Sequence, residues 1–159
     1  MNSIAAAMDV QQPEQQSEAE ASISWQHIYQ LFKGEPAQNS IYLGMWSHHI
    51  IDNDDEYQTT HNLLGITYRG FFGGTFINSV DEQAWGAGVQ RDLYSTKYEV
   101  ISMELGYRLG VLYGYDSMQM ANSGLFPLLQ MYADLHYEHI GIQLSWAGSA
   151  ITAGFFLRF

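Results

Sequence analysis

The sequence predicts an all-β fold: an eight-stranded antiparallel transmembrane β-barrel with a short N-terminal amphipathic α-helix. The 159 residues include 11 Tyr, 8 Phe, 4 Trp and 15 Gly but only 14% charged residues, a composition typical of strands that face lipid. From Ile41 to the end, apolar residues alternate with polar or small ones, which is the period of a strand. No apolar run reaches the about 18–20 residues that a transmembrane helix needs. A membrane-spanning chain of this kind must therefore form a closed barrel.

Residues 1–23 are predicted to be an acidic, disordered leader. From Asp9 to Ser22, Gln and Glu predominate and Val10 is the single large apolar residue. Such a segment buries too little surface to offset its ordering entropy. The triplet Ala5-Ala6-Ala7 fits either the end of a signal-peptide cleavage site or a low-complexity start, and the sequence leaves both open.

Residues 24–34 are predicted to form the amphipathic helix. Their large apolar residues recur at spacings of three and four, which is a helical stripe. Ser24 is a suitable N-cap, and Gly34 followed by Pro36 ends the helix. A helix of this kind lies along a membrane interface or covers the end of a barrel. The stripe consists of Trp25, Ile28, Tyr29, Leu31 and Phe32.

Residues 41–159 are predicted to form the barrel. Tight turns are expected at Arg69-Gly70 and at Ala147-Gly148-Ser149, and longer polar loops at 52–56 and 116–122. Short turns at one rim and long loops at the other are typical of outer-membrane barrels. A soluble lipocalin-like barrel is the structural alternative, but it would carry more charge on its outer face. The expected strands cover 41–50, 61–69, 71–79, 84–94, 98–112, 124–135, 139–147 and 149–159.

The interior of an eight-stranded barrel holds side chains or one small ligand, not an aqueous channel. If Trp146 and Phe159 face lipid, the inward positions of the last two strands are small or apolar. Such a lumen suits a hydrocarbon chain, and a tightly packed core would show the same pattern. These inward positions are Gly141, Ser145, Thr152, Gly154 and Phe156.

The charge and the residue types exclude several functions. A net charge of -11 argues against a nucleic-acid partner, which would need basic patches. The absence of Cys excludes disulfides and thiol chemistry. We expect no cofactor and no metal. A metal site built on His48, His49 and His61 is the weaker alternative, because adjacent His residues on a strand point to opposite faces unless the strand ends there.

Histidines gather where the first strand ends. Alternation from a lipid-facing Trp46 turns His48 outward and His49 inward, and His61 follows after the acidic loop. Asn78-Ser79 ends a strand that reaches the same rim. A His, a hydroxyl and an amide at one mouth are the groups that acyl transfer uses, although His residues and Asn-Ser turns are also ordinary at barrel rims.

At these residues the sequence resembles the lipid A palmitoyltransferase family (PagP), over roughly Ser24 to Phe159. Phe76-Ile77-Asn78-Ser79 resembles its Phe-x-Asp-Ser motif, followed by Trp85-Gly86-Ala87-Gly88. The segments 125–129, 142–146 and 155–159 resemble its last strands. Asn78 stands where the family pattern has Asp, and Asp81 nearby is an alternative negative partner.

The resemblance implies an enzyme of the bacterial outer membrane whose partners are phospholipid and lipid A (lipopolysaccharide). The barrel is expected to be membrane-embedded, and a closed barrel of this size can stand alone as a monomer. The implied reaction moves a palmitoyl-like chain from phospholipid to lipid A. The family's catalytic residues fall on His49, Asn78 and Ser79, with His48 as a rival to His49. The implied substrate-binding positions are Gly88, at the floor of the lumen, and Pro127, which loosens strand pairing for lateral lipid entry. The alternative is a non-catalytic small outer-membrane barrel with a structural or surface-interaction role.

Overall fold

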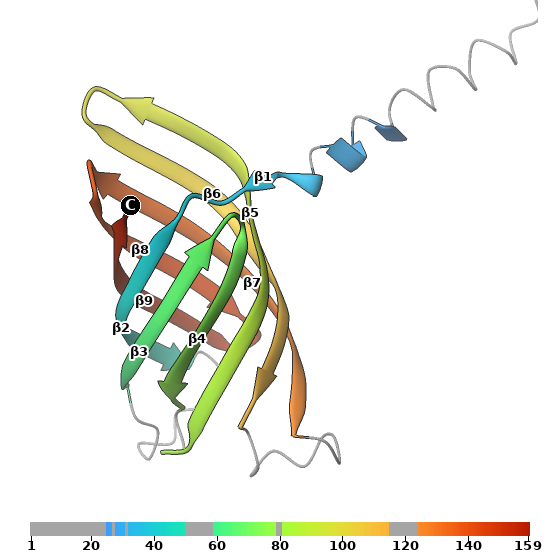
Figure 1. Ribbon diagram of the computed structural model, residues 1–159, viewed down its shortest axis with the longest axis vertical. Helices are drawn as coiled ribbons and strands as arrows, with labels where there is room; N and C mark the ends of the chain where they lie inside the picture. The colour runs from blue at the N-terminus through green and yellow to red at the C-terminus, as the bar shows by residue number, and fades with distance from the viewer. Residues whose placement is uncertain (1–24, 27, 31, 50–58, 79–80, 115–123) are drawn as a thin grey trace, which may run out of the picture. The chain divides into compact units, whose positions relative to one another are not determined.

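Eight antiparallel strands close into a barrel in the computed structural model (Figure 1), which describes residues 25–26, 28–30, 32–49, 59–78, 81–114 and 124–159. Each strand pairs with the next along the chain, and the first and last strands pair with each other from Ser40↔Arg158 to His49↔Ala150. A two-residue strand, β1 (Glu35–Pro36), pairs with Arg91 and Asp92 of β5. The barrel strands are β2 (Ser40–His49), β3 (Thr60–Tyr68), β4 (Phe71–Ile77), β5 (Gln83–Tyr98), β6 (Ile101–Tyr113), β7 (Leu125–Tyr137), β8 (Ile140–Ala147) and β9 (Ala150–Arg158).

The predicted strands are confirmed, with one notable shift in the middle of the chain. β5 runs to Tyr98 and turns at Glu99-Val100, whereas the sequence placed the end of this strand near residue 94. Its pairing with β6 continues beyond the last residue that pairs with β4, Val89. The extension could not be predicted because residues 95–97 are polar. A hairpin that buries neither face does not need alternating apolar residues.

The two rims differ in their connections. We call the rim with the two-residue turns at 69–70, 99–100 and 138–139 the short-turn rim, and the opposite one the loop rim. In the first turn Arg69 and Gly70 have φ values of 52° and 76°, as a type I′ hairpin requires. The tight turn at 148–149 lies on the loop rim with the longer connections, so the predicted separation of short and long connections is only approximate.

The N-terminal segment belongs to a separate unit, Met1–Phe32. Described residues between Trp25 and Lys33 have helical backbone, but residues 24, 27 and 31 lie outside the described residues and the predicted helix is not established. Within the described part of the chain, no helix has the length and hydropathy to cross a bilayer. The predicted leader, residues 1–23, lies outside the described residues.

A β-bulge in β2 sets which side chains face the lumen. Pairing shifts between Leu43 and Met45, and Gly44 has a φ of 68°, which favours glycine. The extra residue reverses the alternation after Tyr42, so that Trp46 faces outward while Ser47 is buried inside. The sequence-based orientation of His48 and His49 is confirmed: His48 is exposed and His49 faces the lumen.

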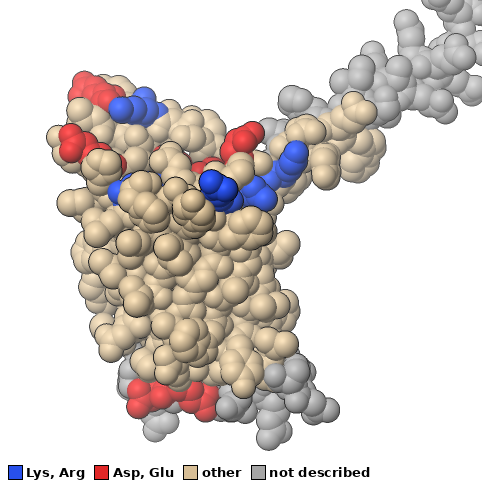
Figure 2. All heavy atoms as spheres, viewed as in Figure 1, with Lys and Arg blue, Asp and Glu red and all other residues tan. Residues whose placement is uncertain are grey.

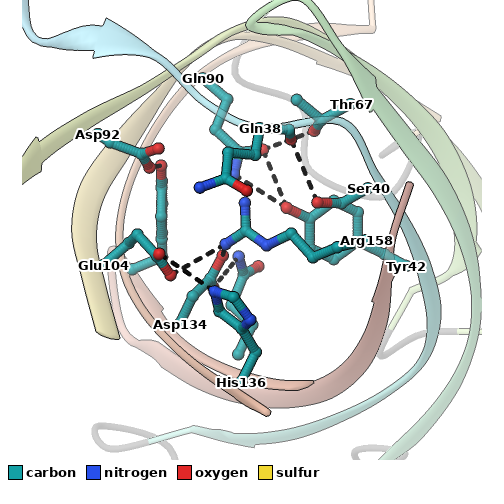
Figure 3. Close-up of polar contacts among 12 residues, drawn as sticks. Gln38, Ser40, Tyr42, Thr67, Gln90, Asp92, Glu104, Asp134, His136 and Arg158 are labelled. Atoms are coloured by element: carbon teal, nitrogen blue, oxygen red, sulfur yellow. Dashed lines mark hydrogen bonds and ion pairs between the residues drawn. The ribbon is translucent and has the colours of Figure 1, made fainter. Parts of the chain in front are cut away.

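The lumen near the short-turn rim is filled by charged and polar side chains (Figure 3). Arg158 Nη2 lies 3.1 Å from Glu104 Oε2 and 3.1 Å from Asp134 Oδ2, and all three side chains are buried. His136 pairs with Glu104, and Gln143 donates to Asp134. We call Glu104, Asp134, His136, Gln143 and Arg158 the ionic layer. The predicted inward residues of β8 and β9 do face inward, but this half of the lumen is far more polar than their sequence suggests.

Candidate active site

The other half of the lumen, toward the loop rim, contains a cavity of about 390 Å³. This volume falls within the about 300–1,000 Å³ of small-molecule sites. Its walls are largely apolar, with polar groups at two levels. Ser47, His49, His61 and Asn78 lie toward the loop rim, and Tyr42, Arg108 and Gln130 lie at the inner end. The apolar wall includes Met45, Leu63, Phe72, Phe76, Leu112 and Leu128.

Ser47 and His61 form a hydrogen-bonded pair in the cavity wall. Ser47 Oγ lies 2.6 Å from His61 Nε2, and His61 Nδ1 lies 2.6 Å from the carbonyl oxygen of Ile77. Because a carbonyl oxygen only accepts, Nδ1 carries the proton, and Nε2 of the neutral imidazole accepts from the Ser47 hydroxyl. A hydroxyl, a base and a group that orients the base are the parts of an activated nucleophile.

Three neighbouring strands hold this pair. The bulge at Gly44 turns Ser47 inward on β2, and the Ser47 amide donates to the Thr59 carbonyl at 2.9 Å. His61 follows at the start of β3, opposite Met45, and Ile77 is the last residue of β4. All three groups are therefore carried on strand backbone.

Two of the catalytic residues that the family resemblance implies, His49 and Asn78, lie at the same end of the lumen. His49 lines the cavity, and so does Asn78, whose exposed fraction is 1%. The side-chain Nδ2 of Asn78 donates to the Gly114 carbonyl oxygen at 3.2 Å, and its Oδ1 accepts from the backbone N–H of Glu82 at 2.9 Å. Ser79 lies outside the described residues. The catalytic roles of His49, Asn78 and Ser79 stay predictions.

Gly88 and Pro127 lie on neighbouring parts of the wall. Gly88 pairs with Gly110, and a Cβ built on it would lie 2.2 Å from the Leu109 carbonyl oxygen. Pro127 pairs with Val111 and borders the cavity with an exposed side chain. Because proline lacks a backbone donor, it can weaken this pairing. The substrate-binding roles of both residues stay predictions.

Gly88→Ala is expected to lower the free energy of unfolding by about 1–3 kcal/mol, because the new methyl group forces β5 and β6 apart. Gly65→Ala is the matched control, since its Cβ would meet its nearest atoms at 3.6 Å, an ordinary contact. Urea titrations in lipid vesicles, followed by Trp fluorescence, compare the two. Equal stability of both variants would contradict a close approach at Gly88. A larger side chain at Gly88 is therefore a poor probe of chain length.

His48 faces away from the cavity that His49 and His61 line. Among the residues that the structure describes, no group of three or more His, Asp or Glu side chains is arranged to hold a metal ion.

The sequence places His61 at this rim but does not identify Ser47 as its partner. Their pairing depends on the bulge and on the register of β2 against β3, which the intervening loop conceals. A usable signal was present in the alternation from Trp46, which also turns Ser47 inward. The chain matches no known protein-family model and no curated protein.

Proposed function

We propose that this protein is a bacterial outer-membrane acyltransferase that moves a fatty acyl chain from a phospholipid to lipid A. The membrane location is supported by the outer face of the barrel. Figure 2 shows an uncharged band between charged ends on one face. Soluble monomers rarely expose contiguous apolar patches larger than a few hundred Å². Exposed apolar side chains on the strands include Leu64, Ile66, Leu105, Leu109, Leu129, Leu135, Ile142, Leu144, Phe155 and Leu157.

Exposed aromatic side chains lie near both ends of this band, where membrane barrels place their interfacial girdles. The chain enters and leaves the barrel at the short-turn rim, and the longer connections lie opposite, as in outer-membrane barrels. The aromatic residues are Trp46, Trp85, Tyr113 and Trp146 near the loop rim, and Tyr68, Phe71, Tyr137 and Phe159 near the short-turn rim.

The observation that carries the enzymatic proposal is the Ser47–His61 hydrogen bond beside an apolar cavity. Ser47 Oγ attacks the ester carbonyl carbon of the phospholipid, and its proton passes to His61 Nε2. The bond from the acyl carbon to the glycerol oxygen breaks, and that oxygen takes the proton. The acyl chain is then an ester of Ser47.

Transfer to the acceptor reverses these steps. A hydroxyl of lipid A gives its proton to His61 Nε2 and attacks the acyl carbon, and Ser47 Oγ leaves with the proton. The family resemblance implied His49 as the base. We assign that role to His61 because its Nε2 is already hydrogen-bonded to a hydroxyl, and we place His49 in the wall that contacts substrate.

Expression of the chain in a bacterium without its own lipid A palmitoyltransferase is expected to add one acyl chain to lipid A, seen as a new heavier species in mass spectra. Ser47→Ala is expected to remove that species. Ser95→Ala, at an exposed site on β5, is the matched control and keeps it. If folded wild-type barrel in the outer membrane leaves lipid A unchanged, the non-catalytic alternative replaces this proposal.

A further inference from the structure

Arg108 lies at the inner end of the cavity, and the residue is 9% exposed. Its Nε donates to Gln90 Oε1 at 2.9 Å, and its Nη1 donates to Gln130 Oε1 at 3.0 Å. The guanidinium stacks over the Tyr42 ring with its central carbon 4.5 Å from the ring centroid. These contacts fix the guanidinium in one orientation, and all of them are made to uncharged groups.

Arg108 makes no ion pair with any residue that the structure describes, in contrast to Arg158, which contacts two carboxylates. Its Nη2 has no hydrogen-bond partner among the same residues. Cation–π contacts and neutral acceptors offset only part of the desolvation of a buried cation. An anion at this position would therefore gain a charge-assisted hydrogen bond in a desolvated site.

We propose that the inner end of the cavity binds the carboxylate of a free fatty acid, with the hydrocarbon chain directed toward Ser47 and His61. Nη2 of Arg108 donates to the carboxylate, and the walls above it are formed by Leu63, Phe72, Leu112 and Leu128. Ser47 lies five positions after Tyr42 on β2, and one of these positions is the bulge residue. Four strand steps of about 3.3 Å at a tilt near 40° give a depth of about 10 Å. That depth suits a medium-chain fatty acid.

This inference does not depend on the proposed reaction, because binding requires no acyl transfer. It predicts that a free fatty acid occupies the space that the donor chain would use. A phospholipid acyl chain has no charge at its tail, so Arg108 favours the free acid over the esterified chain at this end of the cavity.

The test is a binding titration of the full chain in phospholipid nanodiscs with carboxyl-¹³C-labelled decanoate, read by ¹³C NMR against empty nanodiscs. Decanoate is expected to bind, 1-decanol to bind at least about 10-fold more weakly, and acetate not to saturate. Arg108→Met is expected to weaken decanoate binding about 10- to 100-fold, as for loss of a hydrogen bond to a charged group, with little change for 1-decanol. Arg108→Lys keeps the charge and should retain part of the preference.

Gly65→Leu is the second variant, because a side chain at Gly65 has room beside Tyr42 and projects into the cavity. It leaves Arg108 in place and should abolish binding of both ligands. Equal affinity of the wild type for decanoate and 1-decanol would overturn the proposal, and this comparison holds even if Arg108→Met fails to fold. An equal loss of both ligands in folded Arg108→Met would also overturn it.

Discussion

His61→Gln is expected to reduce acyl transfer by about 10⁴- to 10⁶-fold, the range seen when a member of a serine–histidine unit is removed. Gln keeps approximate size and a donor toward the Ile77 carbonyl, but it cannot accept the Ser47 proton. Transfer of a labelled acyl chain from phospholipid to lipid A in mixed micelles measures the loss. The electrophoretic mobility of unheated samples reports whether the barrel remains folded.

His49→Gln is the matched control for this experiment, because His49 lines the same cavity on the strand that carries Ser47. If His61 is the base, the His49 variant should lose far less activity than the His61 variant. The reverse order would return the base to His49, as the family resemblance implies. The double variant Ser47→Ala/His61→Gln should be no less active than either single variant, since residues that act as a unit are strongly non-additive. Additive losses would contradict the pair.

The closed barrel was predictable because each of its strands must turn an apolar side toward its surroundings. In β8 and β9 the alternation from Ile140 to Phe159 contains the strand bounds and the inward residues directly. The end of β5 was harder to predict, because its last residues pair with β6 but do not cover a core. Where a hairpin buries neither face, its sequence shows no alternation of apolar and polar residues.

The interior was not predictable in the same way. Glu104 and Asp134 pair across β6 and β7, and the closure of the barrel brings Arg158 of β9 to both carboxylates. The Ser47–His61 pair likewise depends on an extra residue at Gly44 that reverses the alternation. Single-strand patterns predict which side of the wall a residue faces, whereas contacts across the lumen depend on register and shear.

Arg158→Met is expected to lower the free energy of unfolding by about 3–5 kcal/mol, because it leaves buried carboxylates without their cation. Glu104 and Asp134 are each 1% exposed, so water cannot take the place of the guanidinium. Methionine fills much of the vacated volume, which limits the cavity contribution. Urea unfolding in lipid vesicles, followed by Trp fluorescence, measures the change.

Two controls separate charge burial from the loss of an arginine. Lys97→Met removes a cation from an exposed site on β5 and should change stability by less than about 0.5 kcal/mol. Adding Glu104→Gln and Asp134→Asn to Arg158→Met neutralises the layer, while the new amides can still bond His136 and Gln143. Because a buried charge cluster replaced as a whole costs far less than one broken by a single change, this triple variant should be more stable than Arg158→Met alone. If it is equally unstable, the ionic layer stabilises the barrel through packing, and charge compensation is not its role.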